Sequence, residues 1–494
     1  MTNIQRTTAA GLLLLALGVS SAAPAHAQCG ELSWLEAINQ ALDANQALVA
    51  ERQTLDAQQK DIAIARSSML PDLVFGGLAQ VSSDTTFSSS AGVVPERTLQ
   101  VAGEIKETVY NQSYIDTLGS QKHLFRSQQY TYENTRNQTI AEVGQDYVGV
   151  LLAEALMALQ DENVALSEGS LELTEAQESS GEVPYSNVLR MRSQLFGAQQ
   201  QRVAQKGSVL QSRFRFNQVR NRPAEEICSL ERLTVEKDGF IFSSNVVVEA
   251  ISEDRSAALA RDYLVDLGLE RSPALHSLDA EIKAEQRRMK SGRRWLIPSL
   301  DAAAAAASFV KTGGEGSGDT SSGVQDGDLF WQVGLTLGWN VLDGGAFIAT
   351  MNQSKAEFWS LRSQRSNTAI SLEENIRGTA AAAMASFERI GLALLQAQAA
   401  EENFALVNEA YLDGASTLLD LIDAQNQLIS ANTSARQALY QFLSDLLTLE
   451  QSIAYYPFLE AAHARAVDCV LPVPRGRCRG AGPRVGRKVS GSLS

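Results

Sequence analysis

Histidine is scarce in this chain of 494 residues, which contains only 4, and aromatic residues make up 6% of it. After residue 27 the histidines are His123, His276 and His463, and each is isolated in the sequence. No group of cysteines or acidic residues has the spacing of metal ligands. We also find no glycine-rich phosphate loop and no nucleophile elbow. These absences argue against an enzyme, so we expect no catalytic residue, no metal site and no cofactor.

An excess of basic residues is missing as well, because the formal net charge is −15 at pH 7. An acidic chain of this kind is not expected to bind nucleic acid. After the first 27 residues, no apolar run approaches the roughly 20 residues that a membrane-spanning helix needs. The sequence therefore argues against a helical inner-membrane protein.

The first 27 residues have the features of a secretory signal peptide. Arg6 supplies a positive start, residues 11–18 form an apolar run rich in leucine, and Ala25-His26-Ala27 offers a small-x-small cleavage site. The mature chain is therefore expected to begin at Gln28, outside the cytoplasm.

Cysteine is rare, with four residues at positions 29, 228, 469 and 478. Two interpretations of the first pair remain open: Cys29 and Cys228 form a disulfide, or both are free. Cys29 also suggests a lipid anchor, although Gln28 precedes it where lipoprotein signals carry a small residue. The other two cysteines lie in a tail rich in Arg, Gly and Pro, which predicts disorder over 457–494.

Proline is confined to a few positions between residues 28 and 456, namely 71, 95, 184, 223, 273 and 298. Proline-free stretches can hold long helices, and the Ala, Glu, Gln and Leu content of these stretches favours helix. We expect helices over 114–180 and 347–411. At 1.5 Å per residue, each can reach roughly 100 Å.

The chain also contains an internal repeat. Matching residues, at shifts of 227 to 233 positions, include Pro71 with Pro298, Val101 with Val333, and Gly181 with Gly414. A repeat of about 230 residues is far longer than a solenoid repeat, so it indicates one large structural half that is duplicated within the protomer.

Alternation predicts two strands in each half. From 331 to 341 apolar residues alternate with small or polar ones, and Trp331 and Trp339 stand about 27 Å apart at strand rise. One apolar face edged by aromatic residues is what a transmembrane barrel strand requires, so we assign both tryptophans to a membrane girdle. The matching segment in the first half is weaker, because Glu107 falls on its apolar side. The predicted strands are 72–81, 98–110, 299–310 and 329–343.

Four strands per chain are too few to close a membrane barrel, because eight is the practical minimum. The chain is therefore expected to share its barrel with copies of itself. The polar segments 82–95 and 311–328 are expected to form exposed hairpin loops on the cell-surface side.

A coiled-coil seam is predicted in the last helix, where apolar residues follow alternating steps of three and four. The seam consists of Leu421, Ala424, Leu428, Ala431, Ala435, Ala438 and Phe442. Its many alanines let helices approach closely. The flanking residues Gln425, Asn426, Gln427, Ser430, Asn432, Thr433 and Gln437 are polar and uncharged. They fit a channel wall, and an ordinary solvated outer face is the alternative.

This order of helix, strand, polar loop, strand, long helix, glycine turn and long helix, all repeated, resembles the TolC-like outer-membrane efflux proteins. The likeness covers about residues 31 to 455. It is carried by Ala47-Leu48, Leu70-Pro71, Pro273-Ala274-Leu275, Ile297-Pro298, Leu342-Asp343-Gly344-Gly345 and, most specifically, residues 411–424 (YLDGASTLLDLIDA). The resemblance implies a mainly α fold with a membrane β-barrel. In it, very long coiled-coil helices and four strands per protomer build a homotrimer with a 12-stranded barrel and an α-helical periplasmic tunnel.

The resemblance also implies a gate. Asp420 and Asp423 match the stretch that constricts the periplasmic entrance in the family, and they lie three apart on one helix, so both can face the same direction. The alternative is a pair of solvated helix carboxylates. Tyr411 is in place for a polar link that holds the entrance shut. Ser416 and Asn187 stand where a basic and an acidic partner are often found, so the closed state is expected to rely on hydrogen bonds.

Function and partners follow from the same resemblance. It implies a passive exit duct in the outer membrane, belonging to a tripartite efflux or type I secretion system, with an inner-membrane pump and a periplasmic adaptor. The adaptor is expected to dock on the turns near Gly181 and Gly414. The sequence does not specify whether a drug, a metal or a polypeptide is transported. The alternative from another class is a structural or adhesive coiled-coil protein of the cell envelope, which explains the seam but not the strands.

These assignments divide the chain into five segments. They are a signal peptide (1–27), a first structural repeat (28–227), an inter-repeat linker or equatorial region (228–262), a second structural repeat (263–456) and a disordered basic tail (457–494).

Overall fold

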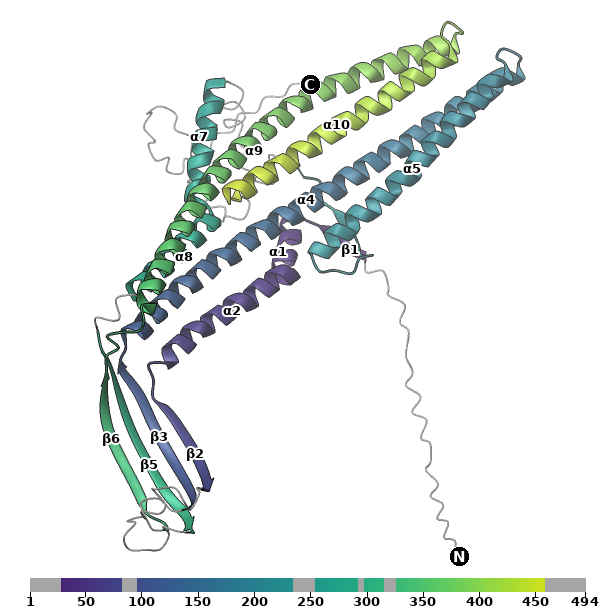
Figure 1. Cartoon of the computed structure of the whole chain (residues 1–494). Helices are drawn as coiled ribbons and strands as arrows, with labels where there is room; N and C mark the ends of the chain where they lie inside the picture. Colours follow the sequence, from purple (N-terminus) through teal and green to yellow (C-terminus); the bar gives the residue numbers. More distant parts are fainter. Residues whose placement is uncertain (1–27, 82–95, 234–253, 292–296, 315–325, 458–494) are drawn as a thin grey trace, which may run out of the picture.

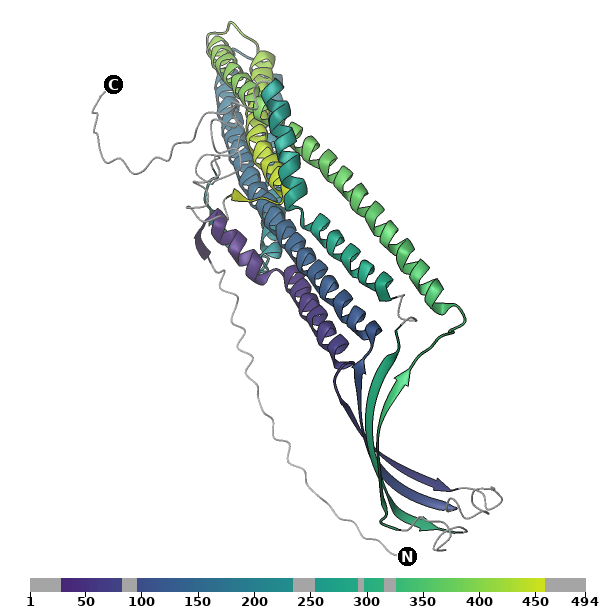
Figure 2. The same cartoon turned by 90° about the vertical axis from the view of Figure 1, so that its left-hand side faces the viewer.

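The computed structural model describes residues 28–81, 96–233, 254–291, 297–314 and 326–457. It is elongated, with a small β-sheet at one end and the turns of two helical hairpins at the other (Figure 1). The view turned by 90° has the same long axis (Figure 2). The predicted signal peptide, the loop 82–95 and nearly all of the predicted tail lie outside the described residues.

The first half of the chain places two helices before a pair of strands and a helical hairpin after it. Its elements are β1 (Gln28–Leu32), α1 (Trp34–Ala44), α2 (Gln46–Ser67), β2 (Asp72–Val81), β3 (Arg97–Tyr110), α4 (Gln112–Ser179), α5 (Tyr185–Val219) and β4 (Ile227–Leu230). The second half repeats this pattern. Its described elements are α7 (Asp254–Arg271), α8 (Pro273–Ser291), β5 (Ser299–Gly313), β6 (Leu329–Gly338), α9 (Ala346–Leu412) and α10 (Leu418–Ile453). Helix α7 spans the predicted boundary between residues 262 and 263.

The long strands form one antiparallel sheet in the order β2-β3-β5-β6. The two halves meet where β3 pairs with β5, so the repeat is joined into a single sheet. Strand β3 begins one residue earlier than predicted, at Arg97, and β5 continues to Gly313. Strand β6 ends at Gly338 rather than at residue 343, so Trp339 lies just beyond it. The ladder ends there because Gly338 pairs with Ser299, the first residue of β5, which directly follows Pro298. Gly344 and Gly345 then take positive φ angles of 68° and 88° before α9 begins.

The register gives this sheet two chemically different faces. Residues on the first, here the apolar face, include Leu73, Phe75, Val101, Ile105, Trp331, Val333, Leu335 and Leu337. Residues on the second, here the polar face, include Asp72, Gln100, Glu104, Lys106, Asp301, Gln332 and Thr336. Strands β3 and β6 therefore carry the predicted alternation, whereas residues 302–307 of β5 are all alanine and β2 places Val74 and Leu78 on the polar face. Glu107 lies on the apolar face, opposite Ala302.

The two longest helices, α4 with 68 residues and α9 with 67, exceed their predicted lengths by one and two residues. Each begins at a side-chain oxygen that accepts backbone N–H groups. Asn111 accepts from the N–H of Ser113, and Asp343 accepts from the N–H of Phe347. Such caps satisfy donors that a helix start leaves unpaired. Since Asn111 directly follows β3, one residue separates sheet from helix.

The main hydrophobic core lies midway along the molecule, where α1, α4, α9 and α10 come together. Trp34 packs edge-on against Tyr147, with ring centroids 5.4 Å apart, and Tyr147 packs in the same way on Phe216. A Cβ on Gly144 would lie 2.7 Å from the Trp34 ring, so only glycine lets α1 approach α4 this closely. This core fixes the root of both hairpins.

Two short strands that the sequence did not predict, β1 and β4, pair in parallel beside this core. The Tyr147 hydroxyl donates to the Leu32 carbonyl at 3.1 Å and to the Glu231 carbonyl at 2.7 Å, which ties both strands to α4. Cys228 of β4 is disulfide-bonded, and its register partner in β1 is Cys29. A free thiol at Cys228 is therefore excluded.

The predicted seam of α10 is buried at Leu421, Ala424, Leu428, Ala431, Ala438 and Phe442, whereas Ala435 is half-buried. One of the flanking residues differs from expectation. Gln425, predicted to lie on a wet face, is completely buried against α4. The reason is geometric: α10 packs on both α9 and α4, so its buried surface is wider than a two-helix seam.

Candidate functional site

The two hairpin turns at the end far from the sheet have the same backbone design. Gly181 and Gly414 adopt φ angles of +82° and +70°, which glycine reaches without strain. After each glycine, an N–H bonds back across the helix end, from Glu182 to the Gln177 carbonyl and from Ala415 to the Ala410 carbonyl. This is the bonding pattern of a helix terminated by a left-handed residue. Both glycines are exposed, and the turns between α4 and α5 and between α9 and α10 lie at the tip of the molecule (Figure 1).

Tyr411, at the end of α9, links the two hairpins. Its ring is buried, and its hydroxyl donates to Gln177 Oε1 of α4 at 2.9 Å. Around it lies a small apolar cluster that includes Met191 of α5 and Leu421 of α10. Sequence reasoning selected Tyr411 but missed Gln177, because 234 residues separate the two.

Asp420 lies in the first turn of α10, where it forms a reciprocal cap with Thr417. Its Oδ2 accepts from the Thr417 N–H at 2.9 Å and from the Thr417 hydroxyl at 2.6 Å, and the Asp420 N–H donates back to that hydroxyl. The Ser416 hydroxyl also donates to Oδ2, at 3.3 Å. Hydrogen bonds from the Thr417 hydroxyl and backbone hold the pKa of Asp420 below its ordinary value. Asp420 therefore starts a helix as well as carrying a charge.

Asp423 lies one turn further along the same exposed side of α10. Its Oδ2 accepts from Gln427 Nε2 at 2.7 Å, a contact within the helix surface. Asn187, in the first turn of α5, is half-buried, and its backbone N–H donates to the Pro184 carbonyl at 2.9 Å. The structure thus places Asp420, Asp423 and Ser416 on one helix start, with Asn187 at the matching position of the other hairpin.

A buried polar layer joins the hairpins further from the tip. Gln425 Nε2 of α10 donates to Ser167 Oγ at 2.9 Å and to Asn163 Oδ1 at 3.3 Å, both on α4. Near it, Gln194 of α5 donates to Asn426 of α10 at 2.9 Å. Together with Tyr411, these contacts are neutral hydrogen bonds between residues of different repeats.

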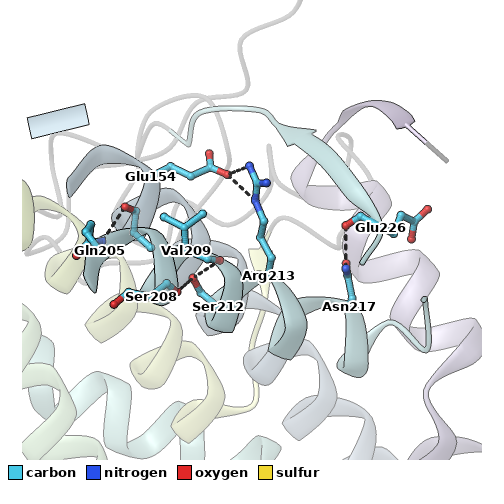
Figure 3. A network of polar contacts seen from close by, with 9 residues as sticks. Glu154, Gln205, Ser208, Val209, Ser212, Arg213, Asn217 and Glu226 are labelled. Carbon is cyan, nitrogen blue, oxygen red and sulfur yellow. Dashed lines mark hydrogen bonds and ion pairs between the residues drawn. The ribbon is translucent and has the colours of Figure 1, made fainter. Parts of the chain in front are cut away.

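Within the first hairpin, α4 and α5 are linked by charged pairs. Arg192 pairs with Glu175 at 2.8 Å, Arg202 pairs with Asp161, and Arg213 donates through two nitrogens to Glu154 Oε1, at 2.7 and 3.2 Å. Figure 3 shows the Arg213 pair beside Asn217, whose amide donates to the Glu226 carbonyl. Charged pairs therefore join α4 to α5, whereas the contacts between the hairpins described above are neutral.

The residues assigned to a girdle both lie at the sheet. Trp331 is on the apolar face and its side chain is 75% exposed in the single chain. Trp339, just after β6, is also exposed. Among the described residues, no group of three or more His, Cys, Asp or Glu side chains could hold a metal ion. None of the described helices combines the length and apolar character needed to cross a membrane.

Two hairpins of very long helices attached to a sheet with one apolar and one polar face define the architecture of outer-membrane channel proteins. Solved structures of this kind are similar to the chain throughout. The outer-membrane channel OprN matches 86% of this chain and 90% of its own, with a TM-score of 0.69 and 15% identity. The CmeC channel of Campylobacter jejuni matches 88% of each chain, with a TM-score of 0.69 and 16% identity. The open-state MtrE channel of Neisseria gonorrhoeae gives a TM-score of 0.65 at 16% identity, covering 85% of this chain and 89% of its own.

Sequence comparison agrees with the fold. Nodulation protein T of Rhizobium leguminosarum bv. trifolii is 21% identical over 442 residues, which is 86% of each protein. Nodulation protein T of Rhizobium leguminosarum bv. viciae is 29% identical over 131 residues, 26% of this chain and 27% of that one. The family model described as outer membrane efflux protein matches residues 37–219 and 264–454. The chain therefore belongs to the outer membrane efflux protein family.

Membership confirms the resemblance seen in the sequence. It places the protein in the outer membrane, with its helical part in the periplasm. The family and the fold are those of efflux channels rather than of enzymes.

Proposed function

We propose that three copies of this chain form a passive exit duct, to which an inner-membrane pump delivers substrates through a periplasmic adaptor. The duct serves a tripartite efflux or type I secretion system. The observation that carries the proposal is the open sheet β2-β3-β5-β6, whose edge strands β2 and β6 run antiparallel to each other. Edge β6 of one copy can therefore pair with β2 of the next, and three copies supply twelve strands with the apolar face toward lipid.

The helices support the same association. Helix α4 packs on α5 and α10, and α10 packs on α9, which leaves α5 and α9 at the two flanks of the four-helix layer. Along α5, apolar side chains at seven-residue spacing are exposed in the single chain, namely Leu189, Phe196, Val203 and Leu210. Along α9, the exposed apolar residues include Leu392, Leu395 and Leu406. Heptad spacing is typical of a coiled-coil contact, and a neighbouring copy supplies the partner helix.

In this assembly the gate lies at the hairpin tips. Asp423 is exposed and accepts a hydrogen bond from Gln427 of its own helix, so it carries the constriction charge, and Asp420 adds charge beside it while capping α10. Three-fold repetition gives six carboxylates around one opening. Two such charges about 6 Å apart repel by roughly 3 kcal/mol at an effective dielectric near 20, which favours a bound cation. Tyr411 holds the closed state through its neutral hydrogen bond to Gln177, and Ser416 and Asn187 stand where ion-pair partners would otherwise lie, so the closed state relies on hydrogen bonds.

The contacts with the adaptor and with lipid are assigned from the positions of the two turns and the two tryptophans. The exposed turns at Gly181 and Gly414 form the tip that meets the periplasmic adaptor. Trp331 and Trp339, at opposite ends of the β6 segment, anchor the barrel at the two lipid interfaces.

Detergent extraction and conductance test the duct. We expect a trimer that leaves membranes only with detergent, dissociates on heating and conducts ions in planar bilayers. A structural coiled-coil protein of the envelope is expected to dissolve without detergent and to leave bilayers silent, and that outcome would remove the duct.

The gate has its own test with a matched control. Asp423→Asn is expected to raise single-channel conductance and weaken block by divalent cations. The control is Asp445→Asn, because Asp445 also accepts from a glutamine four residues away on α10 but lies farther from the tip. Unchanged currents in Asp423→Asn, or equal changes in both variants, count against the gate assignment.

A further inference from the structure

The polar face of the sheet is lined mostly by small or polar side chains. Besides the residues named above, it carries Gly76, Ala102, Ala303, Ala305, Ala307 and Gly334. Small side chains on this face leave the interior of a closed barrel wide. Apolar groups are not needed there, because water fills the interior and the lipid contacts lie on the opposite face.

Near the hairpin ends of the strands, the polar face changes character. Gln100 lies between Leu78 on one side and Phe309 on the other, and Ala307 lies between Ala102 and Phe330 in the adjacent row. The rings of Phe309 and Phe330 meet edge-to-face, with centroids 5.4 Å apart and planes at 88°. We name Leu78, Phe309 and Phe330 the exit collar.

The exit collar is open to the interior rather than buried within the sheet. Leu78 is 50% exposed and Phe330 is 44% exposed, although Phe309 is partly covered. Moving these side chains to the apolar face would place them in lipid, where they gain from burial. Their position on the polar face therefore forgoes that stabilisation, which is typical of a functional contact.

Carboxylates accompany the exit collar. On the same face, Glu104 lies four residues along β3 from Gln100, whereas Asp72, Asp301 and Lys106 lie toward the helix end of the sheet. Just beyond the collar, Asp326 accepts from the N–H and hydroxyl of Thr312 at 2.7 Å each. Aromatic faces next to carboxylates are suited to organic cations that themselves carry aromatic rings.

We infer that the exit collar is a contact site for aromatic organic cations as they leave the barrel. The inference rests on the proposed trimeric duct. When β6 of one copy pairs with β2 of the next, Leu78 of that next copy comes beside Phe330, so three collars form one apolar belt inside the mouth. The belt contacts cargo in transit and slows its return, and small inorganic ions pass without such contact.

The test uses the intact detergent-purified trimer in planar bilayers, with tetraphenylphosphonium added from the collar side. We expect this cation to block the wild-type current, and the double variant F309A/F330A to weaken the block about tenfold, because both ring faces are lost. The control is Phe75→Ala, which removes an aromatic ring from the apolar face and is expected to leave the block unchanged. Tetramethylammonium has the same charge but no ring, so its block of the current is expected to be equal in wild type and in F309A/F330A.

A second variant covers the case in which F309A/F330A does not assemble. F309L/F330L keeps the apolar volume and removes the rings, and a several-fold weaker block by tetraphenylphosphonium is expected. If the channels conduct and tetraphenylphosphonium blocks wild type and these variants equally, the exit collar assignment is wrong and the duct still stands. A wild-type protein that never conducts overturns the duct, and the exit collar with it.

Discussion

The two helical hairpins share length, turn geometry and place in the fold, yet different chemistry holds each of them together. Arginines of α5 reach carboxylates of α4 at three levels, at Arg192, Arg202 and Arg213. Helices α9 and α10 instead pack with buried alanines, including Ala397, Ala424 and Ala431. The two halves therefore share helices and turns, whereas the contacts between their helices differ.

This difference has physical consequences. Exposed ion pairs contribute little and are screened by salt, whereas close packing between alanine-lined helices is insensitive to salt. The hydrogen bonds between the hairpins, at Tyr411 and Gln425, belong to neither type. They are neutral, and Gln425 and the Tyr411 ring are buried. We therefore expect mutations at the three kinds of contact to differ in how much they lower the free energy of unfolding and in how salt changes that loss.

The largest effect is expected from the apolar cluster at the tip. Leu421→Ala removes a completely buried side chain that packs beside Tyr411 and Met191. We expect a loss of about 2–5 kcal/mol in the free energy of unfolding, measured by denaturant unfolding followed by circular dichroism. Leu439→Ala on the same helix is the control, because Leu439 is exposed. Equal losses in the two variants would show that the cluster does not stabilise the tip.

The buried polar layer should come next. Gln425→Ala leaves Asn163 and Ser167 without their amide donor in a buried position, and we expect a loss of about 1–3 kcal/mol in the same measurement. Gln441→Ala, which removes an exposed glutamine from α10, is expected to change little. Gln425 Oε1 has no hydrogen-bond partner in the described structure. A neutral effect of Gln425→Ala would mean that the cost of burying this oxygen cancels the gain from the amide donor.

A pH effect is expected at the root of the first hairpin. Burial raises the pKa of Asp146 from 3.8 to about 6, and Glu142 adds to the shift. Because the folded state holds this proton more tightly than the unfolded state, wild type should lose stability as the pH rises from 3.8 through about 6. Asp146→Asn removes this loss, which we put at about 1–2 kcal/mol for a half-buried group. Melting temperatures that depend on pH in the same way for both proteins would contradict the assignment.

The smallest effect is expected from the charged pairs. Arg202→Gln breaks an exposed pair with Asp161 and should lower the unfolding free energy by about 0.2–1 kcal/mol. In about 1 M salt, where the screening length is about 3 Å, the difference from wild type should vanish. The loss in Leu421→Ala should persist under the same conditions. A salt-resistant loss in Arg202→Gln would indicate that the arginine acts through packing.

Much of the fold could be predicted because its signals are local. The alternation of residues 331 to 341 and the absence of proline between residues 299 and 456 indicate strand and helix without knowledge of distant contacts. Strands β1 and β4 were missed because five and four residues carry too little pattern, and because their pairing joins residues about 200 positions apart. The end of β6 was misplaced because alternation continues to Val341 after the ladder has ended at Gly338.

The candidate site also has parts that could be predicted from the sequence and parts that could not. The cap formed by Thr417 and Asp420 could have been read from the sequence, because a hydroxyl three residues before an acidic side chain is typical of a helix start. The partner of Tyr411 could not, because Gln177 lies in the other repeat. The burial of Gln425 could not be predicted either, since it depends on α4 packing beside α10. The role of Asp423 stays a prediction.

The open edges of the sheet bear on how this protein reaches its place. In hydrocarbon no water is available to satisfy the backbone groups along β2 and β6, so a solitary copy cannot enter the lipid as this sheet. Under the proposed trimeric assembly, the copies must therefore associate and enter the bilayer in one step. Until then, each copy carries two strand edges open to unwanted pairing, so its risk of aggregation rises with its local concentration.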